Sequence, residues 1–266
     1  MSLLFPDRLT VWLTREGVSV MRRTRAGHGR HERVLQLPGG DQDPCALVET
    51  ALAQYRKKHA GAAQFELVLS SAFVQMLCLP MQPALGTVEE EALFVQYRFE
   101  EVFGKQARDW RFSWDAGLAF QPVLACAMPL ALLQGLEAAF QRQGAALLAV
   151  GPWLKHFFNA VLRPLRQASL HCMVVEGGQV FALQTEQGQW SRLHQVSLPS
   201  HETDDGLRAC VRRELLLFPM QGDEALSIYG AAAFQPEHPS ARWVRCKPEE
   251  VWAQGGLPLV QGSRKP

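Results

Sequence analysis

The sequence predicts an α/β protein built from a duplicated unit, with a small α+β module inserted in the first half. The main observation is that one order of elements, three strands, a helix and a strand, occurs twice, starting near residues 9 and 170. A second observation is that residues 73–144, between the repeats, follow their own strand and helix pattern. We therefore expect a first half at 1–72 and 145–168, a module at 73–144, and a truncated second half at 169–266.

The first unit begins with a three-strand meander. Residues 9–14 alternate in polarity, residues 15–17 can turn, and strands follow at 18–24 and 33–37. Asp43 is placed to cap a helix that has Pro44 in its first turn, and residues 65–69 form a short apolar strand. The helix repeats apolar residues at helical spacing, which predicts a buried face of Leu47, Val48, Ala51, Leu52 and Tyr55.

The second unit repeats this order. Strands are expected at 170–175, 179–184 and 190–198, with tight turns at 176–178 and 187–188. Asp204 or Asp205 is expected to cap the helix, and residues 225–229 form the last strand. The buried stripe of this helix is predicted to be Leu207, Val211, Leu215 and Phe218.

The inserted segment predicts a strand, a helix, two strands and a helix, at residues 73–80, 87–103, 110–114, 123–128 and 130–143. Thr87 and Glu90 form a capping box at the start of its first helix. A strand at 146–150 and a helix at 153–165 then return the chain to the first half.

Composition excludes several classes of protein. The chain is 47% hydrophobic and 20% charged, as in ordinary globular proteins, and its 27 basic and 26 acidic residues give a net charge of +1. With a net charge this close to zero, we expect no strong electrostatic attraction to nucleic acid or to an anionic membrane. Its six cysteines are isolated in sequence, which predicts buried, reduced thiols in a cytoplasmic protein and no metal site. The charge-free stretch 116–136 contains two prolines and predicts a strand followed by a helix, rather than a membrane span.

A basic stretch at residues 22–33 contains five arginines and two histidines. Such a stretch can bind the phosphates of RNA, DNA or lipid. The alternative is that these charges protect an edge hairpin from aggregation. We favour the second interpretation because no aromatic residues alternate with the arginines, and we expect no nucleic-acid partner.

The helix at 87–103 carries more apolar residues than one buried face needs. Leu93, Phe94 and Tyr97 project away from its main stripe, which predicts a docking surface for a partner peptide. The alternative is a helix sandwiched between two layers. Its five glutamates are expected to form a solvated acidic face rather than a metal site.

Four segments resemble a known family: LVLSSAFVQMLCLPMQ (67–82), EEEALFVQYRFEEVFG (89–104), VLACAMPLALLQGLEAAFQRQG (123–144) and ALLAVGPWLKHFFNAV (146–161). A strand that ends in Leu-Pro and precedes a glutamate-rich helix is similar to PilM of type IV pilus assembly and to the cytoplasmic part of GspL of type II secretion. The resemblance implies a duplicated actin-like, ribonuclease H-like fold.

The sequence departs from the nucleotide-binding members of this fold. Those members carry an Asp-x-Gly phosphate loop in the first hairpin of each half, but residues 11–17 here read VWLTREG. The second hairpin offers only Glu176, Gly177 and Gly178, and Gly230 alone remains of a later glycine pair. We therefore expect no catalytic residue, no cofactor and no metal. The alternative is an ATPase that binds ATP with magnesium at Glu176, Gly177 and Gly178.

The resemblance implies a non-catalytic scaffold or adaptor on the cytoplasmic side of a type IV pilus or type II secretion assembly platform. It would bind the cytoplasmic tail of an inner-membrane partner, and the motor ATPase is a further implied partner. The resemblance also implies a cytoplasmic location, peripheral to the inner membrane through its partners.

Overall fold

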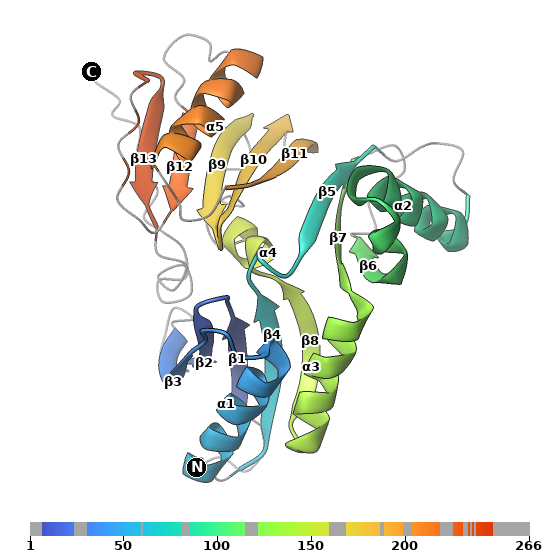
Figure 1. Ribbon diagram of the computed structural model, residues 1–266, viewed down its shortest axis with the longest axis vertical. Helices are drawn as coiled ribbons and strands as arrows, with labels where there is room; N and C mark the ends of the chain where they lie inside the picture. Colours follow the sequence, from blue (N-terminus) through green and yellow to red (C-terminus); the bar gives the residue numbers. More distant parts are fainter. Residues whose placement is uncertain are drawn as a thin grey trace.

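The computed structural model describes residues 7–23, 31–59, 61–80, 86–114, 122–159, 169–186, 189–198, 204–218, 226–230, 234, 236 and 238–246 (Figure 1). Within them the chain forms two five-stranded sheets and one three-stranded sheet. The two large sheets lie at opposite ends of the molecule, and the small sheet projects from one side (Figure 1).

The first large sheet has the order β3-β2-β1-β4-β8. Its strands are β1 (Asp7–Leu13), β2 (Gly17–Arg23), β3 (His31–Pro38), β4 (Ala63–Leu69) and β8 (Ala146–Pro152). The first three pair antiparallel, whereas β1, β4 and β8 run parallel. Helix α1 (Pro44–Lys58) begins where predicted, because the carboxylate of Asp43 accepts a hydrogen bond from the Ala46 amide at 2.8 Å. All five residues predicted for its buried face are buried.

The second large sheet repeats this topology in the order β11-β10-β9-β12-β13. Its strands are β9 (Leu170–Glu176), β10 (Gln179–Glu186), β11 (Gln189–Ser197), β12 (Leu226–Gly230) and β13 (Ala241–Arg245), with the same directions as their counterparts. The duplication is thus confirmed, and it extends to β13, which the sequence analysis missed. In helix α5 (Asp204–Leu217) both aspartates lie in the first turn, and three of the four predicted stripe residues are buried. Phe218 is only half-buried, and Glu214 is buried in its place.

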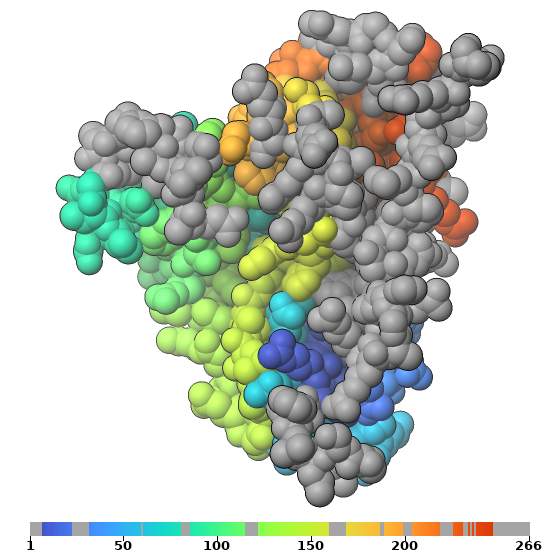
Figure 2. All heavy atoms as spheres, turned by 180° about the vertical axis from the view of Figure 1, so that it is seen from behind, coloured from blue at the N-terminus to red at the C-terminus, as the bar shows by residue number. Residues whose placement is uncertain are grey.

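The three-stranded sheet has the order β5-β7-β6, with all neighbours antiparallel. It comprises β5 (Gln75–Leu79), β6 (Trp110–Trp114) and β7 (Val123–Pro129), and it is accompanied by α2 (Val88–Phe103) and the 3-10 helix η1 (Lys105–Asp109). The capping box is present, since the Glu90 amide donates to the Thr87 hydroxyl at 3.2 Å and the Glu90 carboxylate accepts from the Thr87 amide at 3.1 Å. In the view of Figure 2, α2 forms the outer edge of the molecule on one side.

Helix α3 (Leu130–Arg142) belongs to the core of the first half, although the sequence analysis placed it in the inserted segment. It packs against α1, and its buried Phe140 makes an edge contact with Phe65 of β4 at 5.8 Å between ring centroids. Arg142 pairs with Glu49 of α1 at 2.7 Å. The elements that share their own hydrophobic cluster are β5, α2, η1, β6 and β7, and β5 and β7 also join the core of the first half through Met76 and Met128.

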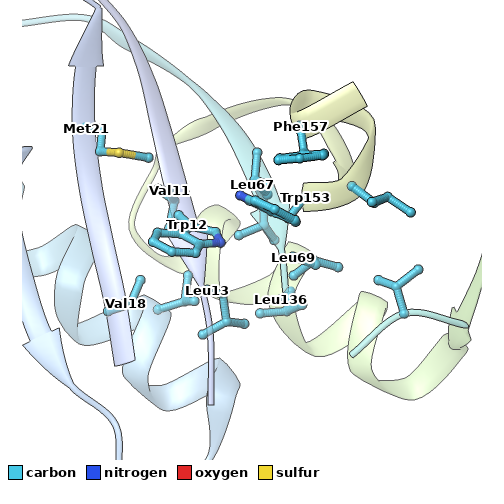
Figure 3. Close-up of a cluster of buried hydrophobic side chains, with 14 of the residues drawn as sticks. Val11, Trp12, Leu13, Val18, Met21, Leu67, Leu69, Leu136, Trp153 and Phe157 are labelled. Carbon is cyan, nitrogen blue, oxygen red and sulfur yellow. The ribbon is translucent and has the colours of Figure 1, made fainter. Parts of the chain in front are cut away.

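One hydrophobic core runs through both halves. Figure 3 shows Trp12, Trp153 and Phe157 beside Leu67 and Leu69 in the first half. The short helix α4 (Trp153–Phe157) extends this core to the second sheet, because Phe157 meets Tyr229 with ring centroids 5.4 Å apart. Residues 160–165 of the helix predicted here lie outside the described residues.

The structure bears on two further expectations. Within the described ranges, no helix is long and apolar enough to cross a bilayer, and the stretch considered as a span holds β7 and the start of α3. None of the six cysteines forms a disulfide. Only Cys172 and Cys246 are buried, and the other four are half-buried.

Candidate functional site

The first candidate site is the junction of the two halves, where the equivalent hairpins β1–β2 and β9–β10 turn. The turn of the first hairpin is closed on itself: the Thr14 amide donates to the Gly17 carbonyl at 2.8 Å, and the Gly17 amide donates to the Thr14 hydroxyl at 3.1 Å. The Glu16 carbonyl accepts from the Gly39 amide at 2.7 Å. These groups of the first turn therefore bond within the first half.

The second hairpin reaches across to the first half. Gly177 and Gly178 form a two-residue turn with φ of +60° and +74°, values that favour glycine. Glu176, at the start of this turn, is only 4% exposed, and its Oε2 accepts a hydrogen bond from the Ser71 amide at 2.7 Å. Ser71 follows β4, so this carboxylate joins the two halves.

Close backbone approach accompanies this hydrogen bond. A Cβ atom added to Gly177 would lie 2.4 Å from the Ser70 hydroxyl oxygen, so only glycine fits there without displacing Ser70. Ser70 is fully buried, and its amide donates to the Leu13 carbonyl at the end of β1 at 2.9 Å. The end of β1, the residues after β4 and the second hairpin thus meet at one point.

The electrostatics of this junction oppose ionisation of Glu176. Burial raises the pKa of its carboxyl, although the hydrogen bonds from Ser71 and Ser70 act in the opposite direction. The charge of Glu16 in the first hairpin raises the pKa further. A carboxylate that holds a hydrated metal ion must be charged and open to solvent, whereas this one is enclosed by protein.

Gly230, the one glycine left of the later pair, is also covered by protein. A Cβ atom added there would lie 2.4 Å from the indole ring of Trp243 on β13. Gly177 of the alternative nucleotide site and Gly230 are thus both in close contact with other parts of the chain, whereas a Cβ atom added to Gly178 would meet no atom within 4 Å.

An apolar pocket of about 90 Å³ lies elsewhere, between the inserted module and the first half. It is lined by residues of β6 and β7, by the end of β8 and by Leu133 of α3. Among its lining residues, Arg111 brings a charge and Ser113 a hydroxyl, and Phe112, Met128 and Val150 give it an apolar wall. Sequence analysis missed this pocket because it forms only where three distant segments meet.

The predicted docking residues on α2 do not share one environment. Leu93 and Tyr97 are 67% and 64% exposed, whereas Phe94 packs against the core of the module. Val95 and Phe99 form the buried side of the helix, and Val88 and Val102 near its ends are exposed. Where the structure describes its surroundings, α2 packs on one side only, so it is not sandwiched between two layers.

A buried ionic cluster under α5 was not predicted. Glu214, 4% exposed, bonds to His171 of β9 at 3.0 Å and to Arg192 of β11. Burial opposes its ionisation, but these partners outweigh that effect and lower the pKa of Glu214. The Arg192 guanidinium also lies over the Phe218 ring at 4.0 Å.

The basic stretch at residues 22–33 belongs to neither candidate site. Its first arginine, Arg22, contacts Tyr55 and Asp7, and residues 24–30 lie outside the described residues.

Comparison with solved structures defines the class of the fold. The chain is similar to a protein from Bacteroides thetaiotaomicron with an actin-like ATPase fold and unknown function, with a TM-score of 0.59, 10% identity, and 84% and 80% of the two chains covered. The chain therefore has an actin-like fold, as the resemblance implied. No protein-family model matches the sequence, and no curated protein matches it.

Two further similar structures come from bacterial assembly systems. One is the cytoplasmic domain of EpsL, an inner membrane component of the type II secretion system of Vibrio cholerae, with a TM-score of 0.60, 11% identity, and 97% of this chain and 100% of that chain covered. The other is the PilM-PilN type IV pilus biogenesis complex, with a TM-score of 0.58, 11% identity, and 84% and 81% covered. The suspected likeness to PilM and GspL is confirmed at the level of the fold.

Proposed function

We propose that this protein is a non-catalytic scaffold on the cytoplasmic side of a type II secretion or type IV pilus assembly platform. The observation that carries the proposal is the hydrogen bond from the Ser71 amide to Glu176. It commits the only acid of the candidate phosphate loop to holding the two halves together. The likeness to the EpsL cytoplasmic domain and to PilM-PilN supports the choice of system.

The partner in this proposal is the cytoplasmic tail of an inner-membrane protein, and the motor ATPase is a further proposed partner. The apolar pocket between the module and the first half is the better place for an apolar anchor of the tail, because a concave site buries more of a side chain than a helix face does. The edge strands β6 and β8 border it, and their backbone groups can pair with an extended peptide.

Binding of synthetic tail peptides, followed by fluorescence anisotropy, tests this placement. Ser113 is exposed at the pocket rim, so Ser113→Trp should cover the pocket and weaken binding at least tenfold. The double variant Leu93→Asp/Tyr97→Asp alters the outward face of α2 and should leave tail affinity within twofold. The opposite pattern would place the tail on α2, and no binding by any platform tail would reject the proposed partner.

The second candidate function is an actin-like ATPase that uses Glu176, Gly177 and Gly178. It requires Glu176 to leave Ser71 and become charged. At a ligand concentration of about 100 times Kd, binding would stabilise the fold by about 2.7 kcal/mol, which a thermal melt detects easily. We expect no shift with magnesium and ATP. A shift that Glu176→Ala abolishes would support the ATPase instead.

A further inference from the structure

The exposed apolar side chains are concentrated on two helices. Among the described residues, eight large hydrophobic side chains are exposed, four of them on α2 and two on α5. On α5 these are Leu216, 82% exposed, and Leu217, 52% exposed. On α2, Leu93 and Tyr97 lie one turn apart on the side opposite the buried Val95 and Phe99. Both helices therefore turn an apolar patch toward solvent in addition to the face that they bury.

The charges around the two patches have opposite signs. On α2, Glu89 and Glu101 continue the row of Leu93 and Tyr97 at four-residue spacing, one at each end. Glu101 remains half-exposed even in its pair with Arg98. On α5, Arg212 and Arg213 are exposed one turn before Leu216 and Leu217. The α2 patch therefore has acidic ends and the α5 patch has basic neighbours, so the two patches are complementary in charge.

The two patches lie in separate parts of the molecule. Helix α5 packs on the second sheet, at one end of the chain's fold, whereas α2 packs on the module that projects from the side (Figure 1). In Figure 2 the atoms of α2 occupy the outermost edge of that projection. Each patch can therefore meet its complement only on another molecule.

We propose that α2 of one copy of this chain binds α5 of a second copy, with Leu93 and Tyr97 against Leu216 and Leu217. The carboxylates of Glu89 and Glu101 then face Arg212 and Arg213. Because the two contacting surfaces differ, the interface is heterologous, and each bound pair leaves one α2 and one α5 free to continue the array. A contact between two helix faces is small, so association is weak and depends on concentration. The inference goes beyond the proposed function and does not depend on it.

Sedimentation velocity of the full chain over a concentration series tests this interface. Leu93→Asp/Tyr97→Asp disables the α2 face, and Arg212→Glu/Leu216→Asp disables the α5 face. Each variant alone should weaken self-association at least tenfold. All four positions are exposed or at the helix surface, so both variants should keep the far-UV spectrum and melting temperature of the native chain.

Mixing the two variants gives the decisive result. Each retains the face that the other lacks, so an equimolar mixture should form a one-to-one dimer that grows no further. A wild-type chain that stays monomeric at millimolar concentration would overturn the inference, as would a mixture that stays monomeric. If Arg212→Glu/Leu216→Asp instead abolished binding to phosphatidylglycerol vesicles by a monomeric wild-type chain, the α5 patch would be a membrane surface and the proposal would be wrong. Tail binding at the pocket, measured separately, distinguishes any of these failures from failure of the proposed function.

Discussion

The two halves share one sheet topology but differ in what connects the parallel strands. In the first half, the chain between β4 and β8 holds the whole inserted module and α3. In the second half, only residues 231–240 connect β12 to β13. The helices differ as well, since α1 buries only apolar side chains and tyrosine, whereas α5 buries Glu214. The duplicated sheets therefore keep the same strand pairing, and the surfaces that differ between the halves are carried by the connecting segments.

The buried acid of α5 gives the largest expected effect. Glu214→Ala leaves Arg192 and His171 without their shared partner, and breaking a buried ionic contact costs about 4 kcal/mol. Urea unfolding monitored by tryptophan fluorescence measures this cost. The matched control in the first half is Glu49→Ala, which removes an exposed ion pair with Arg142 and should cost far less, because solvent screens that pair. If the two substitutions lowered the free energy of unfolding equally, the buried acid of α5 would be no more important to stability than the exposed acid of α1.

Helix α3 provides the next effect in size. Leu136 is fully buried in the core of the first half, so Leu136→Ala should destabilise the protein by about 3 kcal/mol through lost burial and a cavity. Amide hydrogen exchange shows which helices and strands lose protection in this variant. Amides of α1 and β8 should exchange faster, whereas those of β5, β6 and β7 should keep their relative protection. Faster exchange confined to the three-stranded sheet would return α3 to the inserted module.

The second hairpin offers a matched pair of glycines. Gly177 and Gly178 both have positive φ, but only Gly177 lies against Ser70, while a Cβ atom on Gly178 would meet no atom within 4 Å. Gly178→Ala should therefore cost about 1 kcal/mol of backbone strain, and Gly177→Ala about 2 kcal/mol or more. Thermal unfolding compares them. Equal costs would show that the hairpin does not rest on the first half.

The smallest effect concerns pH. Because burial raises the pKa of Glu176 in the folded state, its contribution to stability is complete below the unfolded pKa of about 4.3 and is lost as pH rises through the folded pKa. Glu176→Gln keeps an acceptor for the Ser71 amide and removes the charge, so it should gain about 1 kcal/mol over wild type at pH 8. Urea midpoints at pH 5 and pH 8 check the sign, and a variant that is less stable at pH 8 would contradict it.

Most strands and helices could be predicted because their signals are local. Alternation, turn glycines and caps lie within a few residues, as at Asp43 and at Thr87 with Glu90. β13 was missed because it is a five-residue strand with an arginine as its second and its last residue, and its pairing with β12 is not encoded locally. The position of Glu214, three residues after Val211 on the buried stripe, was a signal that sequence analysis could have used.

The candidate site was less predictable than the fold. Glu176 and Ser71 are 105 residues apart, and a pair of serines after a strand has no distinctive pattern. A helical wheel separates Leu93, Phe94 and Tyr97 from the main stripe, but only the position of the three-stranded sheet decides that Phe94 turns inward. The pocket likewise requires β6, β8 and α3 to be placed together. Each of these features depends on packing between distant segments.

The side chain of Gln195 has a consequence for solubility. The side-chain carbonyl of Gln195 accepts a hydrogen bond from the Met76 backbone amide at 2.9 Å, and its side-chain NH2 donates to the Val74 carbonyl at 3.4 Å. These bonds place β5 of the module beside β11, which is an edge strand of the second sheet. An open strand edge of this kind recruits other chains and begins aggregation. One glutamine thus lets the module shield that edge, and the same contact that positions the module helps to prevent uncontrolled sheet growth.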